Sequence, residues 1–400
     1  MVLLAFYMTP FEVGLYVWPM LILTFYYSAL DGAVRQIVVP SWNSATAFRF
    51  LLRYRTLASL LGILAMLGTI IVLFVVFPEE PNQIFSLAPL LLVPVFNSFA
   101  LIPLGFLQKL NQWRSLARMQ VVAAAVSLLV SVPALVLTQS LLGASLQVLL
   151  TEAMFAFAAQ RQASKLGMHE ARSALTEGAT YGREFAHSSV FFVGGWAQAQ
   201  VDKVLVGVLA GTNVLGSYNF ALAVARNPGD AISASTSNVL RVRLAEARDA
   251  TSPQIARVTD QLMVKALAIA TVVVLVIAFA VRTVLVPVLG SEWGTPLRAS
   301  MIALISIIPT VLSWALPIVM LTVGRMKWAA WVRVVGIVAA IPIAFAAADG
   351  LEGAAWLLLA REFVMLALFA VACGRAVPVK ALAFCSVVTA ALSLAALWWV

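Results

Sequence analysis

Four ionisable side chains in hydrophobic surroundings are the first candidates for chemistry in this chain. Asp202 and Lys203 are neighbours in one apolar stretch, and Arg226 and Asp230 lie four residues apart in the next. An ionised group at the centre of a membrane helix costs roughly 2.5–3.5 kcal/mol on insertion, so such groups face water or a partner of opposite charge. We therefore expect these four residues to surround a polar site.

The positions of these residues predict which of them pair. Adjacent helix residues point about 100° apart, so Asp202 and Lys203 cannot neutralise each other on one face. Asp202 lies 11 residues before Asn213 and Arg226 lies 13 residues after it, which gives them similar depth in a helical hairpin. We predict an Asp202–Arg226 pair. Because Pro228 removes a backbone donor and disfavours a continuous helix, we also expect a helix break there.

Two roles are open for this cluster. In the first, the four side chains line a hydrated cavity and present charge to an anionic substrate group. In the second, they form an ion-pair cluster that fixes the packing of two helices and binds nothing.

Glu152 and Glu362 each lie in the middle of an apolar stretch and form a separate set of candidates. We favour a structural role, in which they anchor groups of helices through Arg118 and Arg333 or through neighbouring amides. The alternative is that one of these carboxylates takes part in proton coupling.

Other kinds of site are not indicated by the sequence. Cys373 and Cys385 show no metal-ligand spacing, and His169 and His187 are isolated. We find no phosphate-binding glycine loop and no Ser/His/Asp set in a soluble segment. We therefore predict no metal site, no cofactor and no enzymatic activity.

The composition predicts an all-α integral membrane protein. Hydrophobic residues make up 62% of the chain and charged residues 11%, and the mean hydropathy is +0.99. Apolar runs of roughly 18 or more residues, long enough to span a bilayer, recur throughout. We predict twelve such helices, at residues 12–30, 55–77, 86–107, 117–138, 141–160, 186–211, 215–242, 262–289, 297–323, 328–348, 353–374 and 380–400.

The basic residues predict which ends of the helices face the cytoplasm, because Lys and Arg are retained on that side. Of the 26 basic residues, 21 fall in or beside six segments that alternate with neutral or acidic loops. These segments are 35–55, 109–118, 161–183, 241–265, 325–333 and 375–380. The net charge of +9 therefore indicates topology and attraction to anionic lipids, and we predict no binding of nucleic acid.

Matching segments indicate an internal repeat. Three matches occur in the same order: TPFEVGLY (9–16) with TNVLGSYN (212–219), Trp113 and Arg118 with Trp328 and Arg333, and GASLQVLLTE (143–152) with GAAWLLLARE (353–362). The first pairs Gly14 with Gly216 at an offset of 202, and the last pairs Glu152 with Glu362. We infer two copies of one unit in the same orientation, although similar composition alone is the competing explanation.

Several segments resemble one family of transporters. DKVLVGVLAGTNVLGSY (202–218), GSEW (290–293), LTVGRMKWAAWVRVVG (321–336) and GAAWLLLARE (353–362) are similar to the polysaccharide-transporter, or lipid-linked oligosaccharide flippase, branch of the multidrug/oligosaccharidyl-lipid/polysaccharide exporter superfamily. DGAVRQIVV (31–39) resembles the acidic-Gly-x-x-Arg-Gln end of that family's second helix.

The resemblance implies a MATE-like fold of two parallel-repeat helix bundles around a central cavity. It implies that basic residues of the inner helices engage a lipid pyrophosphate, and Arg35 joins the four central residues as a binding candidate. We expect a bundle at 1–160 that lacks a first helix, a cytoplasmic linker at 161–185, a second bundle at 186–375 and an additional helix at 376–400.

The function predicted from this resemblance is transfer of a polyprenyl-pyrophosphate-linked oligosaccharide across a bacterial cytoplasmic membrane by alternating access. The expected partners are this lipid-linked glycan, anionic lipids and the glycosyltransferases or polymerase of a glycan pathway. An exporter of drugs or organic cations and an inactive homologue are the alternatives. A membrane glycosyltransferase is disfavoured, because the sequence has no long outer loop bearing acidic residues or arginines.

Overall fold

A computed structural model describes residues 2–41, 45–168, 181–246 and 251–399, and every regular element in these ranges is helical. The long helices are α2 (Pro10–Ser41), α3 (Ala45–Val76), α5 (Val93–Lys109), α6 (Trp113–Thr138), α7 (Leu142–Lys165), α8 (Tyr181–Ala210), α9 (Thr212–Glu246), α10 (Ser252–Ala280), α12 (Gly294–Ile305), α13 (Ile307–Thr322), α14 (Met326–Val338), α16 (Leu351–Cys373) and α17 (Val379–Trp399). Shorter helices include α1 (Val2–Ala5), α4 (Pro81–Phe85), α11 (Val286–Val288) and α15 (Ile341–Asp349).

Most of these helices are long and apolar enough to cross a membrane. Within the described residues, nine spans meet this condition, and the α12–α13 pair adds a tenth if it counts as one span. Outward-facing residues are apolar, as with Leu137 at 83% and Val371 at 80% exposure. The predicted all-α, multi-pass membrane architecture is confirmed.

Among the described residues, α8 and α9 do not meet this condition, and the other ten of the twelve predicted spans correspond to the nine spans and the bent pair. Both are long, but α8 carries Asp202 and Lys203, and α9 carries Arg226 and Asp230. A helix with such side chains needs polar surroundings along part of its length.

The structure has no break at Pro228 in α9 and has a bend between α12 and α13 instead. α9 is continuous from Thr212 to Glu246 and includes Pro228, so the predicted break at Pro228 is wrong. A proline removes only one hydrogen bond, and a helix packed on its neighbours can accommodate that loss. The predicted helix 297–323 is instead bent by 44° at Ser306. Pro309 follows this bend, and its ring crowds the carbonyl four residues earlier, at Ile305.

The chain forms two compact units. Unit A comprises Leu15–Ala197, and unit B comprises Met1–Gly14 together with Gln198–Val400. The helices α2 and α8 each begin in one unit and end in the other. The predicted bundle boundaries remain a prediction, since residues 169–180 of the expected linker lie outside the described residues.

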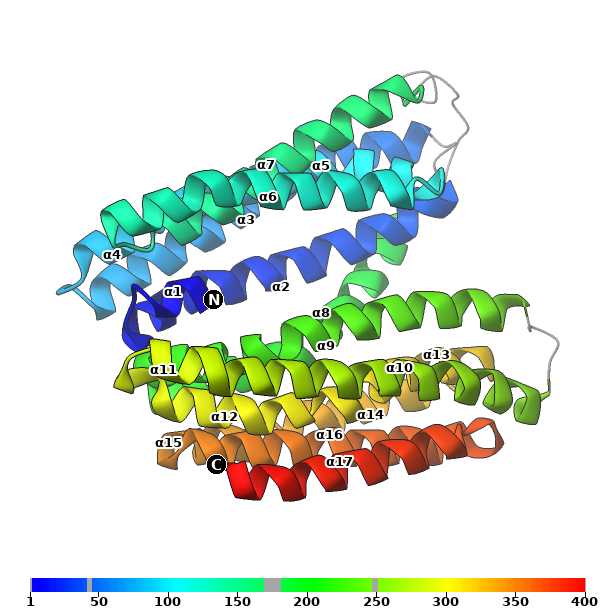
Figure 1. The fold of residues 1–400 in the computed structure, drawn as a ribbon. Coiled ribbons are helices and arrows are strands. Elements are labelled where there is room, and N and C mark those ends of the chain that lie inside the picture. Colours follow the sequence, from blue (N-terminus) through cyan, green and yellow to red (C-terminus); the bar gives the residue numbers. More distant parts are fainter. Residues whose placement is uncertain (1, 42–44, 169–180, 247–250, 400) are drawn as a thin grey trace. The chain divides into compact units, whose positions relative to one another are not determined.

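In unit A, α7 packs against both α5 and α6 (Figure 1). Its face of small residues, Ala156, Ala159 and Ala163, is fully buried and allows α5 to approach closely. The start of α8 packs on α2 in the same unit, where the indole nitrogen of Trp196 donates to the Thr24 hydroxyl over 3.1 Å.

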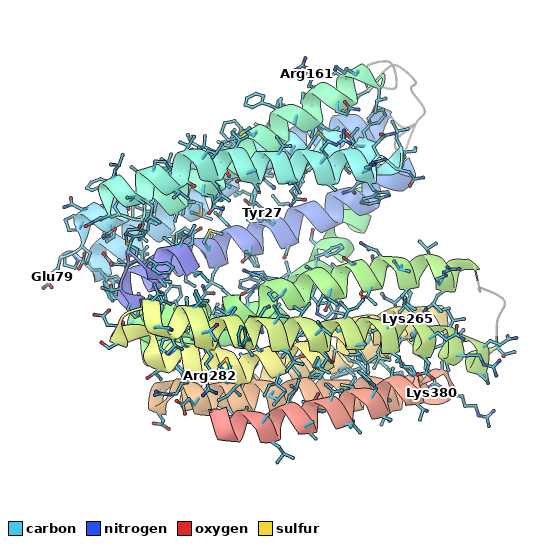
Figure 2. The ribbon with its side chains drawn as sticks, viewed as in Figure 1. Tyr27, Glu79, Arg161, Lys265, Arg282 and Lys380 are labelled. Carbon is cyan, nitrogen blue, oxygen red and sulfur yellow. The ribbon has the colours of Figure 1, made fainter. Side chains whose placement is uncertain are left out.

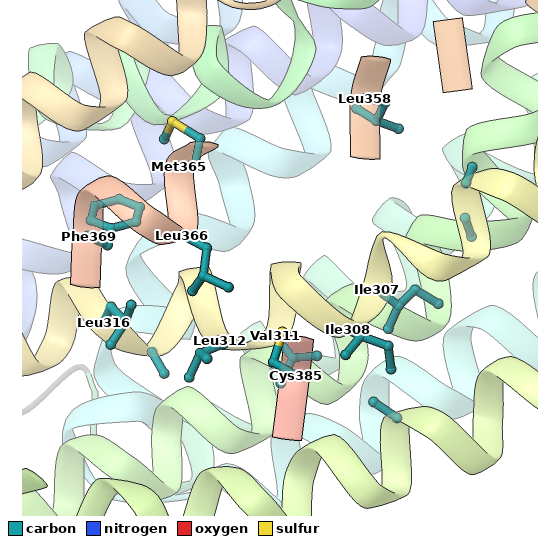
Figure 3. Close-up of a cluster of buried hydrophobic side chains, with 14 of the residues drawn as sticks. Ile307, Ile308, Val311, Leu312, Leu316, Leu358, Met365, Leu366, Phe369 and Cys385 are labelled. Carbon is teal, nitrogen blue, oxygen red and sulfur yellow. The ribbon is translucent and has the colours of Figure 1, made fainter. Parts of the chain in front are cut away.

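In unit B, α13 is the central helix and contacts α9, α10, α16 and α17. Figure 3 shows part of the resulting core, in which Leu312 and Leu316 of α13 lie near Leu366 and Phe369 of α16. Close packing of this kind holds α16 at a fixed position beside α8 and α9, which carry most of the candidate residues.

The starts of α2 and α9 cross at two glycines. A Cβ on Gly14 would lie 2.0 Å from the carbonyl oxygen of Thr212, and a Cβ on Gly216 would lie 1.8 Å from that of Pro10. Only glycine permits this approach. The two contacts are reciprocal at the predicted offset of 202 residues, as a repeated unit requires.

The labelled charges lie at the ends of the helices. In unit A, Glu79 and Arg161 lie at opposite ends (Figure 2). In unit B, Lys265 and Lys380 lie toward one end and Arg282 toward the other. The pair in unit A agrees with the predicted alternation of basic and non-basic ends, whereas in unit B the basic Arg282 lies at the end opposite Lys265 and Lys380.

Candidate functional site

The candidate site in unit B is built on the hairpin of α8 and α9. The two helices are joined at Gly211, whose φ of +91° is a left-handed conformation suited to glycine. This tight turn places Asp202 and Arg226 at matching depth. The predicted pair is present, with 3.4 Å between Arg226 Nη2 and Asp202 Oδ2.

Asp202 is the buried centre of the cluster, with no exposed surface. Its Oδ2 accepts a hydrogen bond from the Tyr218 hydroxyl at 2.9 Å and lies 3.9 Å from Arg361 Nη1. Its Oδ1 has no hydrogen-bond partner among the described residues. One carboxylate oxygen therefore accepts hydrogen bonds from Tyr218 and Arg226 and lies near Arg361, while the other accepts none within the described part of the chain.

Arg226 is a cation of the cluster that reaches the surface. Its side chain is 22% exposed, and its Nη1 donates to the carbonyl oxygen of Ala199 over 2.5 Å. A guanidinium has five donors in a fixed plane. Because Asp202 and Ala199 occupy only part of this set, Arg226 can present the remainder to a carboxylate or phosphate.

Lys203 and Asp230 lie at the edge of the cluster. Lys203 is half-buried and Asp230 is exposed, and Lys203 is within electrostatic range of Arg226, Asp202 and Asp230. Neither Lys203 nor Asp230 forms an ion pair with another described residue. Both side chains keep charge available at the accessible margin of the site.

Arg361 of α16 is a site residue that the sequence did not predict. Its side chain is 3% exposed, and its Nη2 lies 3.4 Å from Glu362 Oε1 and donates to the Gln198 carbonyl at 3.1 Å. Tyr218 was noted only as part of the repeat. The signal for Arg361 was an arginine within an apolar helix, which is rare unless the group is paired.

The structure thus brings Asp202, Arg226 and Arg361 together with Glu362, and it places Lys203 and Asp230 at their margin. Glu362 pairs with its chain neighbour Arg361. Glu152, its repeat equivalent, belongs to unit A, where it lies in electrostatic range of Tyr27.

Arg35 lies within α2, but its side chain is outside the described part of the chain. Its predicted role as a binding residue stays a prediction.

The cluster is suited to charge recognition. It contains three cations, Lys203, Arg226 and Arg361, and three anions, Asp202, Asp230 and Glu362. Among the described residues no group of three His, Cys, Asp or Glu side chains could hold a metal ion, and Cys373 and Cys385 carry free, buried thiols. Arginine and lysine side chains hydrogen-bond well to anionic groups, and Arg226 and Lys203 are the partly exposed cations of this cluster.

Comparison with known proteins extends these observations. One solved structure similar to this chain is described as the inward-facing conformation of a multidrug resistance MATE family transporter of the MOP superfamily. It matches with a TM-score of 0.68 and 13% sequence identity, over 98% of this chain and 94% of that one. The chain therefore has the fold of this class of membrane transporter. No curated protein sequence matches.

A family model described as "Polysaccharide biosynthesis protein" matches residues 3–297. This range includes α2 to α11 and all four central candidate residues, Asp202, Lys203, Arg226 and Asp230, but it ends before Arg361 and Glu362. Because the match covers well over half of the 400 residues, the protein belongs to this polysaccharide biosynthesis family.

Proposed function

We propose that this membrane transporter moves a polyprenyl-pyrophosphate-linked oligosaccharide across the bacterial cytoplasmic membrane, as a step in making a cell-surface polysaccharide. The family places the chain in polysaccharide biosynthesis, and its fold is that of a transporter. A precursor built on a membrane lipid has to cross that membrane before the polysaccharide is assembled outside. Transport of such a precursor accounts for both the family and the fold.

The observation that carries the proposal is the partial exposure of Arg226 beside a fully buried counter-ion. Its guanidinium is partly exposed on a helix too polar to count as an apolar span, and its counter-ion Asp202 is fully buried. A cation held in this way is positioned for an anion that arrives from outside the cluster. A pyrophosphate offers several oxygens to the planar donors of arginine, and Lys203 supplies a second positive charge.

In the proposed cycle, the pyrophosphate binds at Arg226 and Lys203 while the polyprenyl tail stays in lipid. Alternating access then exposes the bound head group to the other side of the membrane. The glycosyltransferases that build the oligosaccharide and the polymerase that consumes it act before and after this step.

The proposal is tested by complementation of a bacterial strain that lacks its own flippase. We expect Arg226→Ala and Lys203→Ala to abolish surface polysaccharide while the amount of protein in the membrane stays normal. Arg298→Ala is the matched control, since Arg298 is an exposed arginine of unit B, paired with Glu352 at 2.6 Å. Equal polysaccharide from the wild type and both site variants, at matched expression, would refute the proposed role of the site.

A second candidate function is export of a drug or organic cation, because the similar solved structure is a multidrug resistance transporter. At 13% identity the likeness concerns the fold alone. The partly exposed guanidinium of Arg226, set against the fully buried carboxylate of Asp202, favours an anionic substrate group over a cationic one. Export of a cationic dye by the wild type, and its loss in Asp202→Asn, would favour this alternative.

A further inference from the structure

Arg361 is a buried cation with unused hydrogen-bonding capacity. In the repeat that pairs Glu152 with Glu362, the equivalent of Arg361 is Thr151, so only one half carries the guanidinium. The Nε and Nη1 atoms of Arg361 have no hydrogen-bond partner among the described residues. Leaving donors of a buried charge unsatisfied is costly, which points to a partner gained in another state of the protein.

Asp202 likewise has a carboxylate oxygen that accepts no hydrogen bond from a described residue. Its Oδ1 is buried without a hydrogen bond, and its Oδ2 lies 3.9 Å from Arg361 Nη1. A movement of about 1 Å would bring these groups to the length of a charged hydrogen bond. Arg361 contacts Glu362 and the Gln198 carbonyl through Nη2, so Nη1 and Nε are the atoms left to bond Asp202.

The existing ion pair of Asp202 with Arg226 is long. The separation of 3.4 Å between Arg226 and Asp202 exceeds the usual length of a charged hydrogen bond, and Arg226 reaches the surface. If Arg226 moved away alone, the buried carboxylate of Asp202 would lose its main counter-ion. An uncompensated buried charge strongly opposes such a movement.

We propose that Arg361 is a positioning residue that neutralises Asp202 when Arg226 turns to the pyrophosphate of the substrate. This inference rests on the proposed function of Arg226. Arg361 does not contact the ligand; it reduces the electrostatic cost of freeing Arg226. Asp202 thus exchanges one arginine for another, and the charge of the buried cluster stays balanced with and without the ligand.

The test measures binding of geranylgeranyl pyrophosphate to the full chain in lipid nanodiscs, with geranylgeraniol as the probe that lacks the pyrophosphate. We expect Arg361→Gln to weaken pyrophosphate binding about tenfold, equal to about 1.4 kcal/mol at 25 °C. Asp202→Asn added to Arg361→Gln should restore binding to within about threefold of wild type, because a neutral side chain needs no counter-ion. Binding of geranylgeraniol should stay the same in all variants.

The outcomes separate this inference from the proposed function. Loss of binding in Arg226→Ala with unchanged binding in Arg361→Gln would overturn the role of Arg361 alone, as would a double variant no better than Arg361→Gln. Wild-type protein that binds both probes equally would overturn both proposals. If Arg361→Gln does not fold, binding of geranylgeranyl pyrophosphate is measured in the double variant and in Arg361→Lys. Near-normal binding by both variants supports the positioning role of Arg361. Binding that is tenfold weaker in a folded double variant refutes that role.

Discussion

Replacement of Asp202 by alanine tests the energetics of the buried cluster. The carboxylate is fully buried and lies near two arginines, Arg226 at 22% and Arg361 at 3% exposure. Removing one partner of a buried pair costs about 3–5 kcal/mol, because the remaining charge is left uncompensated. Arg226 can turn toward water and Arg361 keeps Glu362, so we expect Asp202→Ala to destabilise the protein by about 3 kcal/mol, at the lower end of that range.

The assay is equilibrium unfolding of the purified protein in mixed micelles, supported by thermal unfolding. Tyr218→Phe removes only the hydroxyl that donates to Asp202 at 2.9 Å, and we expect a loss of about 1.5 kcal/mol. Arg298→Ala, at the exposed pair with Glu352, should change stability by less than about 1 kcal/mol.

A second substitution identifies the source of the Asp202→Ala effect. If the loss comes from the orphaned guanidinium of Arg361, Asp202→Ala combined with Arg361→Met should be more stable than Asp202→Ala alone. Wild-type stability in Asp202→Ala, or a double variant less stable than the single one, would refute the reasoning that this cluster is held by mutual charge compensation.

Three further predictions concern the rest of the chain. Gly216→Ala should destabilise the protein by about 1–3 kcal/mol, because the added methyl group overlaps the Pro10 carbonyl. The control Gly68→Ala, whose Cβ meets nothing within 4 Å, should stabilise the protein by about 0.5 kcal/mol. Unfolding curves that rank the two variants in the opposite order would contradict the close helix crossing. Single cysteines at Glu79 and Lys380 should react with an impermeant maleimide from opposite sides of the membrane, and labelling of both from one side of intact cells would disprove the topology. Glu362→Gln should lower the stability of the protein by about 1 kcal/mol, because the ion pair with Arg361 is lost. Transport by this variant should respond to a pH gradient as transport by the wild type does. Loss of that response in a stable variant would assign Glu362 to proton coupling instead.

The sequence was sufficient to predict the membrane class, the helices and the Asp202–Arg226 pair. Apolar runs of bilayer length depend on composition alone, and the depth of a residue in a hairpin follows from counting along two helices joined by a short turn. Gly14 and Gly216 were matched in the repeat by position, and the structure shows that both serve the same close crossing.

Other features required the three-dimensional structure. Arg361 is 159 residues from Asp202 in the chain, and no local pattern shows that α16 packs beside α8. The helix bend was expected at Pro228 but lies at Ser306, because the effect of a proline depends on whether neighbouring helices hold the segment straight. The sequence predicts α8 and α9 as apolar spans, but within the described residues neither helix is apolar enough to qualify.

The most direct test of the central claim is transport itself. Proteoliposomes containing the full chain and a fluorescent polyprenyl-pyrophosphate-linked oligosaccharide would report transfer as probe that becomes inaccessible to an external quencher. We predict transfer by the wild type and by Arg298→Ala, and none above empty liposomes by Arg226→Ala reconstituted at equal density. Transfer by Arg226→Ala at the wild-type rate would contradict the claim that this buried charge cluster recognises the pyrophosphate.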